Sequence, residues 1–583
     1  MIGATWNACI RHCLVALIGL FLTAFYPGTT LGMPPHPRLL DESAAKGVVD
    51  AVQLYLPEGK ARAAGLGSPD DFFIKFLNRP QGLQVAQSAS NFRILALLVD
   101  FSDHTASVAP NFFDSLIFDS VGNTINDYFQ EISYGQLDIV TVHEPSTIGW
   151  NRLTYTYDYY VDGQRGIGTY PRNAQGLVAD LVDLVDPAVD FSQYDNDGDG
   201  YVDILLVIHS GTAYEMSGDV NDIHSHKWAL PTPKSKDGVY IRSYTIQPEF
   251  WLSPGDITIG VYAHELCHGF GLPDLYDTDY SSNGIGDWGI MSFGCWNGPD
   301  KLGGSPAHPC AWSRIQMGLT GAVEVTTSLI GEAIEAVEAG GLIYRLPILD
   351  TVSGEYFLIE NRQRMGYDTY LPSSGLLIWH IDSNKPGNSQ EWLPDQSGNY
   401  HFLVALEQAD GQFNLEQSTI HGGNTGDAGD PFPGASNNTV FAATTSPNSD
   451  SYERGSSLNI VNNISMSGNT IRADLIAGSI AASMAAEEIL PGTASLAQNY
   501  PNPFNPATMI EFSLEHPERI ELSIYNLLGQ KVKILFDGFM EQGTTSFQWD
   551  TTDEHGQQVA SGIYLCKLST GGVKLTRKMV LVR

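Results

Sequence analysis

The chain of 583 residues is too long for a single hydrophobic core, so three or four folded units are expected. Hydrophobic residues make up 43% of it and aromatic residues 10%, which indicates globular domains. The formal net charge of −35 argues against nucleic-acid binding, which needs a basic face, and suits a soluble extracellular protein.

The first 32 residues have the pattern of a secretory signal peptide. Arg11 and His12 precede an apolar run over residues 13–25, and small residues near Gly32 follow it. The run is too short to span a bilayer comfortably, so cleavage near Gly32 is expected, and an uncleaved anchor is the alternative. No other segment has the pattern of a membrane span, so we predict no stable one.

The next segments alternate between helical and strand patterns. Residues 33–88 form a distinct segment with helical spacing at 42–55 and no cysteine. Residues 93–101 predict a strand, and residues 123–130 and 174–185 predict amphipathic helices. In the second helix Leu177, Leu181 and Leu184 are expected on one face.

The acidic loop that follows predicts a calcium site. Its carboxylates stand at alternate positions, with a glycine after the third, which makes a compact oxygen cage. The candidate ligands are Asp195, Asp197, Asp199, Asp203 and the carbonyl of Tyr201. The loop is not a full EF-hand, because its twelfth position is Leu206, where a bidentate glutamate is required. The alternative is an Asp/Gly-rich turn that leads into a strand.

Residues 264–274 read His-Glu-Leu-Cys-His-Gly-Phe-Gly-Leu-Pro-Asp and predict a zinc site. His264 and His268 are four residues apart, so one helix face presents both to a single metal ion. Glu265 stands beside them, where a carboxylate can take a proton from a metal-bound water. The alternative is a chance match on a buried helix, and the extension beyond the two histidines disfavours it.

A third ligand is expected after this helix. Gly271 and Pro273 end the helix, and Asp274 follows the turn. Catalytic zinc usually takes three protein ligands and keeps a fourth position for water, so Asp274 meets that need. Glu249 is a weaker rival, better placed to orient a ligand histidine. The loop histidines His224 and His226 are not expected to be ligands.

The flanks of the motif favour a buried helix. Asp256 is the predicted N-cap, and a core-facing stripe at helical spacing is expected from Ile259, Tyr262, Leu266 and Phe270.

Downstream of the motif, Met291 lies in a glycine-rich turn. Zinc peptidases of the metzincin type have a methionine in such a turn beneath the metal, so Met291 is the candidate for an apolar floor that does not ligate zinc.

The rest of the chain has an all-β pattern. Short apolar runs at 356–359, 376–381 and 402–406 alternate with turn residues. Residues 476–495 are rich in Ala, Ser and Gly and read as a linker. Further strand patterns follow at 509–514, 520–525 and 578–583. Cys295 and Cys310 could pair in an oxidising compartment or stay free thiols.

Most of residues 90–475 resembles the immune-inhibitor-A-like secreted metallopeptidases of bacteria. The resemblance covers the segments 92–101, 133–135, 264–277, 305–308, 360–362 and 375–382. It implies a secreted zinc endopeptidase of the metzincin type, made as a precursor, with His264, His268 and Asp274 as zinc ligands and Glu265 as base. Cys267 departs from the pattern, since glycine is expected there.

The last ninety residues are similar to the C-terminal sorting domain of type IX secretion cargo. The similarity rests on Tyr-Pro-Asn-Pro-Phe-Asn-Pro at 500–506 and Gly-Ile-Tyr at 562–564. It implies an immunoglobulin-like sandwich that engages a secretion machinery, in a protein found outside the cell or on its surface.

Together these patterns predict a multidomain α+β protein: a metzincin-like zinc peptidase domain, an all-β sandwich and a C-terminal immunoglobulin-like β-sandwich. The expected parts are a signal peptide (1–32), a pro-segment (33–88), the catalytic domain (89–324), an accessory β-sandwich (325–475), a linker (476–495) and a sorting-like domain (496–583). The expected function is cleavage of extracellular proteins or peptides with catalytic zinc and structural calcium. The alternatives are a catalytically silent surface adhesin on a peptidase scaffold and a zinc hydrolase that acts on another bond.

Overall fold

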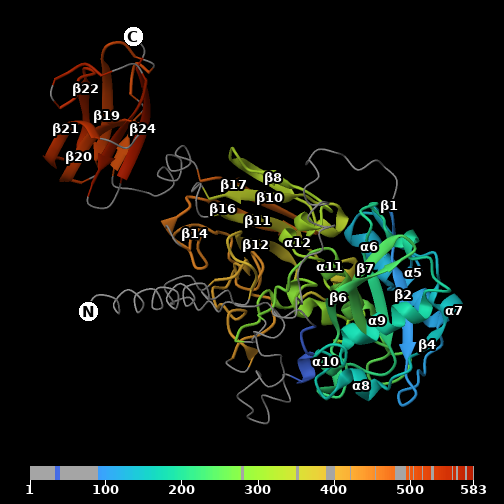
Figure 1. Ribbon diagram of the computed structural model, residues 1–583. Helices are drawn as coiled ribbons and strands as arrows, with labels where there is room; N and C mark the ends of the chain where they lie inside the picture. The colour runs from blue at the N-terminus through green and yellow to red at the C-terminus, as the bar shows by residue number, and fades with distance from the viewer. Residues whose placement is uncertain are drawn as a thin grey trace, which may run out of the picture. The chain divides into compact units, whose positions relative to one another are not determined.

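The computed structural model describes residues 33–39, 90–478 and 494–581 (Figure 1). Short gaps lie at 278–280, 349–353, 389–400, 420–421, 453–454, 498, 503, 515, 527–530, 555, 560–561 and 571–573. The chain forms two compact units. The first comprises Met1–Ser456 and Ile460–Leu475, and the second comprises Ser457–Asn459 and Ile476–Arg583.

The first unit contains a mixed five-stranded sheet in the order β4-β2-β5-β7-β6. Its strands are β4 (Trp150–Arg152), β2 (Leu95–Asp100), β5 (Leu205–His209), β7 (Val239–Pro248) and β6 (His226–Lys236). The first four are parallel to one another, and β6 runs antiparallel to β7 at the edge. The sequence pattern predicted β2 within two residues but missed the β6–β7 hairpin, which begins at His226.

Helices cover both faces of this sheet. On one face, α8 (Tyr157–Val161) and α9 (Ala174–Val185) pack on Leu95, Leu97 and Val99 of β2. On the other face, α5 (Asn111–Phe118), α6 (Ile125–Ile132) and α11 (Ile259–Gly269) pack on Ala96 and Leu98. The two faces separate because successive strand residues point in opposite directions.

The register of α9 corrects one expectation. Leu177 and Leu181 are buried as predicted, but Leu184 is 46% exposed and Val185 is buried instead. The reason is that position 185 continues the i, i+4 row through 177 and 181, whereas position 184 turns towards solvent.

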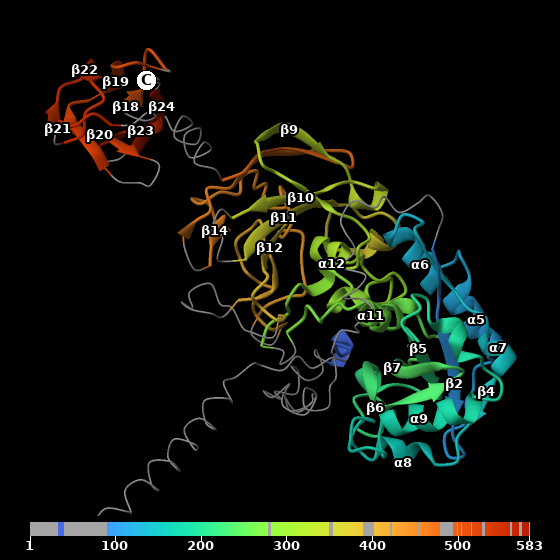
Figure 2. The same ribbon diagram turned by 45° about the horizontal axis from the view of Figure 1, so that its top comes forward.

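Shorter elements complete this part of the unit. They are β1 (Ser90–Arg93), β3 (Leu137–Val140), α7 (Pro145–Ile148), η2 (Phe191–Tyr194), α10 (Tyr214–Ser217), η3 (Gly286–Trp288), η4 (Phe293–Trp296) and α12 (Ala311–Gln316). In both ribbon views α11 and α12 lie between the sheet just described and a second five-stranded sheet (Figures 1 and 2).

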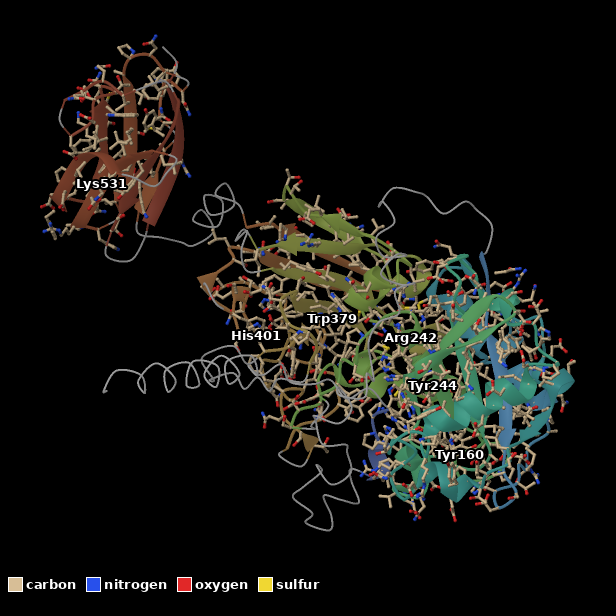
Figure 3. All side chains as sticks on the ribbon, viewed as in Figure 1. Tyr160, Arg242, Tyr244, Trp379, His401 and Lys531 are labelled. Atoms are coloured by element: carbon tan, nitrogen blue, oxygen red, sulfur yellow. The ribbon has the colours of Figure 1, made fainter. Side chains whose placement is uncertain are left out.

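The second sheet has the order β13-β12-β11-β10-β8. Its strands are β8 (Ala322–Glu324), β10 (Ile343–Pro347), β11 (Glu355–Arg362), β12 (Gly375–Asp382) and β13 (Val404–Leu406). Trp379 of β12, labelled in Figure 3, is fully buried and shares one hydrophobic cluster with α11 residues such as Leu266. The β-rich part therefore packs on the helix that carries the zinc motif.

The remaining elements of the first unit are smaller. A three-stranded sheet joins β16 (Ile460–Ser467), β17 (Thr470–Ile476) and β9 (Leu329–Ile334). The others are β14 (Asp450–Ser451), β15 (Gly455–Ser456), η5 (Val337–Ala339) and η6 (Gly366–Tyr370).

A buried ion network joins two of the motifs noted in the sequence. Arg362, which is fully buried, donates to both carboxylate oxygens of Asp368 at 2.8 Å and contacts Glu360 at 3.3 Å. The backbone N–H of His308 donates to the same Asp368 at 2.9 Å. Because a buried charge is costly unless it is paired, this network fixes residues 305–308 against β11.

The second unit consists of two antiparallel sheets around one core. One sheet joins β18 (Ala494–Leu496), β19 (Thr508–Leu514) and β22 (Gly543–Trp549). The other joins β21 (Lys531–Met540), β20 (Glu518–Asn526), β23 (Gly562–Ser569) and β24 (Lys574–Leu581). Phe512 and Trp549 of the first sheet meet Leu522 and Cys566 of the second.

Several expectations fall outside the described residues. They are the signal peptide, the helix at 42–55 and most of the linker. Within the part of the chain that is described, no helix combines the length and apolar character that a bilayer span requires.

A buried histidine lies on β12 of the second sheet. His380 Nδ1 lies 3.1 Å from Glu407 Oε1, and its Nε2 lies 3.1 Å from Glu355 Oε2. The Tyr452 ring stacks on it at 4.0 Å, with the His401–Asp382 pair beyond. Burial disfavours the charged ring, but the two glutamates outweigh it and raise the pKa of His380.

This cluster predicts a stability that falls with rising pH. A raised folded-state pKa stabilises the fold below the unfolded pKa of about 6.5, and that stabilisation is lost as pH rises through the folded value. His380→Asn should therefore destabilise strongly at pH 5.5 and less at pH 9, by about 1.4 kcal/mol for each unit of pKa shift. Thermal melts followed by near-ultraviolet circular dichroism measure the difference. The exposed control His516→Asn should show no such trend, and equal losses for His380→Asn at both pH values would contradict the assignment.

Candidate metal centre

The helix α11 (Ile259–Gly269) is buried along its whole length. It begins after Thr258, and not at the predicted cap Asp256, whose carboxylate accepts from the N–H groups of Trp251, Leu252 and Ser253. Asp256 thus stabilises the turn before the helix, because its side chain accepts hydrogen bonds from three backbone N–H groups of that turn. After the helix, Gly271 has a φ of +86°, which favours glycine and redirects the chain towards Asp274.

Three predicted ligands meet at one point. The Nε2 atoms of His264 and His268 each lie 3.2 Å from Asp274 Oδ1. All three side chains are at most 2% exposed. These contacts lack hydrogen-bond geometry, so both Nε2 atoms and both Asp274 oxygens are without a hydrogen-bond partner. Buried polar atoms are rarely left in that state.

The spacing fits a zinc ion. Two ligand atoms about 2.0–2.1 Å from zinc, at a tetrahedral angle, stand about 3.3 Å apart. The 3.2 Å separations match that edge length. Burial opposes the ionised Asp274, but the two histidines outweigh it and hold the pKa of this carboxyl below its usual range. The donor set therefore suits a buried divalent cation.

Backbone carbonyls orient the two rings. His264 Nδ1 lies 2.8 Å from the carbonyl oxygen of Ile290, and His268 Nδ1 lies 2.8 Å from that of Leu272. Each contact directs Nε2 to the ligand point. Glu249, expected to orient a histidine, instead accepts from the backbone N–H groups of Ser107, Val108 and Gly211.

Glu265 lies beside the ligand point. Single ligand atoms of His264, Glu265 and His268 all fall within 4.8 Å of one another. Both oxygens of Glu265 are buried without a hydrogen-bond partner, and burial raises its pKa well above the usual value. A carboxylate in this position can both accept and return a proton.

The turn that carries Met291 is buried in the same hydrophobic core as α11. Met291 is 1% exposed within the core that contains α11, and its carbonyl oxygen accepts from the Leu275 N–H at 2.7 Å.

Cys267, Cys295 and Cys310 are buried free thiols, so Cys295 and Cys310 do not form the disulfide that the sequence left open. Burial raises the pKa of Cys267, which makes it a poor nucleophile.

The acidic loop gathers part of its predicted ligand set. Carboxylate oxygens of Asp195, Asp197 and Asp199 lie within 4.8 Å of one another. Asp203 lies outside this group, since its Oδ2 accepts two hydrogen bonds of 2.7 Å from Asn196. The Tyr201 N–H donates to Asp199 Oδ1 at 2.9 Å. Three clustered carboxylates repel one another, so a cation would stabilise the loop.

An N-terminal segment runs beside the zinc motif. Residues 33–36 are buried, and in Figure 1 the short segment lies beside α10. The Met33 N–H donates to the Ser225 carbonyl at 3.3 Å, and the His36 N–H to that of Glu215 at 2.9 Å. Opposite them, the Trp296 indole donates to the Pro34 carbonyl at 3.0 Å.

His224 and His226 were not predicted as ligands. His224 Nε2 lies 3.1 Å from the Met33 carbonyl oxygen, and His226 Nδ1 lies 2.6 Å from the carbonyl oxygen of His224. Burial lowers the pKa of both rings, to about 3 and about 4. The contact between His224 and residue 33 joins segments far apart in sequence, so no local pattern could have indicated it.

The first unit thus brings two histidines of one buried helix and a buried aspartate together at one point, beside a sheet with helices on both faces. Residues 112–320 match the model for the "immune inhibitor A peptidase M6, catalytic domain", and residues 498–582 match the "secretion system C-terminal sorting domain". The chain therefore matches an M6 peptidase domain within its first unit and a sorting domain within its second. The latter marks a secreted or cell-surface protein.

Relatives share part of this chain. Immune inhibitor A from Bacillus thuringiensis subsp. alesti is 33% identical over 214 residues, which are 31% of this chain and 30% of that protein. The pre-pro-metalloprotease PrtV of Vibrio cholerae serotype O1 is 28% identical over 289 residues, 40% of this chain and 30% of that protein. The chain thus spans about a third of the length of either relative. Dimeric latent PorU from Porphyromonas gingivalis aligns at 18% identity over 20% of this chain and 11% of that chain, with a TM-score of 0.14, too low to define a fold.

Proposed function

We propose that this chain is a secreted zinc-dependent endopeptidase that hydrolyses peptide bonds of extracellular proteins. The main support is that His264 Nε2 and His268 Nε2 each lie 3.2 Å from Asp274 Oδ1 in the interior, which is the distance expected between two ligand atoms of one zinc ion. The M6 domain match over residues 112–320 and the metalloprotease relatives support the same activity.

In this proposal zinc, when bound, polarises the scissile carbonyl and lowers the pKa of a water molecule. His264, His268 and Asp274 hold the ion. The Ile290 and Leu272 carbonyls keep the two rings aimed at it. Glu265 takes the proton of the attacking water on its carboxylate and returns a proton to the leaving amine.

We extend the proposal to the fold classes. A metzincin-type arrangement is supported by Met291, which is buried in the turn whose Ile290 carbonyl contacts His264. An immunoglobulin-like sandwich is supported by the two antiparallel sheets that share the core of the second unit. We expect that domain to engage a secretion machinery, as its family description implies.

We also propose that the segment 33–88 is a pro-segment whose residues 33–39 obstruct access of substrate to the metal centre. Residues 33–36 are held on one side by residues 215–225 and on the other by Trp296 and Lys301. Glu215 is among the charges that raise the pKa of Glu265, so this contact is near the proposed base. No cysteine is present in 33–88, so obstruction by backbone contacts replaces a thiolate switch.

Glu265→Gln should retain zinc and fold but lose hydrolysis. Glutamine keeps the shape of the side chain but cannot take the proton, which costs about 100-fold or more in rate. Casein cleavage with and without a chelator, together with metal analysis of the same sample, measures both effects. The exposed control Glu144→Gln should stay active. Full activity of Glu265→Gln would refute its proposed role. A wild-type chain that binds zinc but cleaves nothing would favour the silent adhesin.

Calcium should raise the melting temperature through the acidic loop. At about 100 times the dissociation constant, a single site adds about 2.7 kcal/mol to the free energy of unfolding. Asp199→Asn should remove most of this gain, because it weakens a cage built from three carboxylates. The exposed control Asp119→Asn should keep the calcium-dependent shift in thermal melts. An undiminished shift in Asp199→Asn would place calcium elsewhere.

A synthetic peptide of residues 33–39 should inhibit the matured enzyme. Replacing its His36 by alanine removes the contact with the Lys301 carbonyl at 2.8 Å and the edge-on packing on Trp296. Inhibition should then weaken about tenfold. Steady-state inhibition assays with a scrambled peptide as control measure this. Equal potency of the scrambled peptide would exclude a specific plug.

A further inference from the structure

The turn that orients His264 is held by residues far along the chain. Its segment 283–291 contains few hydrogen bonds of its own and many to residues 362–430. The Asp287 N–H donates to the Thr425 carbonyl at 2.6 Å, and the Thr425 hydroxyl donates to Asp287 Oδ2 at 3.1 Å. The Asn283 side chain donates to the carbonyls of Gln417 and Asn424 at 2.7 and 2.9 Å.

Trp288 is the central contact. Its indole N–H donates to Asp430 Oδ2 at 2.9 Å, and its carbonyl oxygen accepts from Arg362 Nη1 at 3.3 Å. Trp288, Asp430 and Arg362 are each at most 1% exposed. Asp430 Oδ2 also accepts from the Asp427 N–H at 2.9 Å, which fixes the carboxylate. Buried hydrogen bonds of this kind are costly to break, because the partner left behind stays desolvated.

The turn and the loop at 424–430 approach so closely that neither Gly286 nor Gly426 has room for a Cβ atom. A side chain at Gly286 would lie 2.1 Å from the Thr425 carbonyl oxygen, and one at Gly426 would lie 2.7 Å from the Trp288 indole nitrogen. Gly286 and Gly426 also have φ values of +56° and +128°, which favour glycine. The turn and the loop at 424–430 therefore touch directly along their main chains.

Ile290, whose carbonyl contacts the ring of the proposed ligand His264, lies two residues beyond Trp288. The Ile290 carbonyl lies 2.8 Å from His264 Nδ1, and the next carbonyl, that of Met291, accepts from the N–H of Leu275, which follows Asp274. The Leu275 carbonyl in turn accepts from the Asn388 side chain at 2.9 Å. Two of the three proposed zinc ligands are thus connected to this turn.

We propose that Asp430 and Arg362, through Trp288, are positioning residues that set the His264 ring for zinc, so that the β-rich part of the first unit forms part of the metal site. This inference rests on the proposed zinc site. Hydrogen bonds that orient a metal ligand typically change metal affinity by about 10- to 100-fold when they are lost.

The test measures zinc affinity in the full chain. All variants carry Glu265→Gln, which prevents self-cleavage, and zinc is titrated against a chromogenic chelator. Trp288→Phe, which removes only the indole N–H, and Asp430→Ala should each weaken zinc binding about tenfold or more. Asp430→Asn keeps an oxygen acceptor of the same shape and should bind zinc nearly as the parent does.

The matched control is Trp150→Phe. Trp150 donates its indole N–H to the Val108 carbonyl at 2.8 Å in the same unit, but it does not contact the turn. It should lose stability as Trp288→Phe does and keep its zinc affinity. Affinities are compared below the melting temperature of every variant.

A second readout needs no metal. The Leu275 and Ile285 amides, which bond to the Met291 and Leu275 carbonyls, should exchange faster with solvent in Trp288→Phe and Asp430→Ala but not in Trp150→Phe. Unchanged exchange and unchanged zinc affinity in the first two variants would overturn the inference, as would an equal loss of affinity in the control. A parent chain that binds no zinc would instead refute the proposed function, while the exchange data would still decide whether Asp430 holds the turn.

Discussion

The first unit is arranged around three buried side-chain atoms that could bind a metal ion and that have no hydrogen-bond partner. His264 Nε2 and His268 Nε2 each lie 3.2 Å from Asp274 Oδ1, in an interior where unpaired polar atoms are costly. Such an arrangement persists only if its surroundings fix every partner. The buried helix α11, the positive-φ turn at Gly271 and the carbonyls of Ile290 and Leu272 supply that rigidity.

The support extends well beyond the peptidase motif. The sheet β4-β2-β5-β7-β6 carries α11 on one face, and the sheet built on β11 and β12 packs from the other side through a shared core. Arg362 belongs to a fully buried ion network that also contains Asp368 and Glu360. Its Nη1, which contacts Glu360, also donates to the Trp288 carbonyl. Stability of the β-rich part and geometry of the metal site are therefore coupled by the same side chains, as is common where a site needs a rigid surround.

The two units have separate cores. In the second, residues from both sheets close on Trp549 and Leu522, which are fully buried. In the proposed function the second unit engages the secretion machinery and the first unit carries out hydrolysis, and separate cores allow the two roles to lie in separate domains. The sorting-domain match over residues 498–582 and the M6 match over residues 112–320 divide the chain in the same way.

The sequence alone determined what depends on short spacing. Two histidines four residues apart fix a shared helix face, a glycine ends that helix, and short apolar runs predict the strands β2, β11 and β12. The identities of Glu265 and Asp274 as candidates followed from the same short stretch. The acidic loop was only partly determined, because Asp203 turns to Asn196 and away from the three other carboxylates.

Only the tertiary structure decided which groups meet across long separations. Ile290 lies 26 residues beyond the ring it orients, the Met33 carbonyl meets His224 from 191 residues away, and Trp288 meets Asp430 across 142 residues. Local periodicity carries no information on such pairs, since they arise from how separate elements pack. The same reason explains why Glu249 binds backbone amides instead of a ligand histidine. The helix start differs for a local reason, because the Asp256 carboxylate accepts from the preceding turn and leaves Thr258 before the first helical residue.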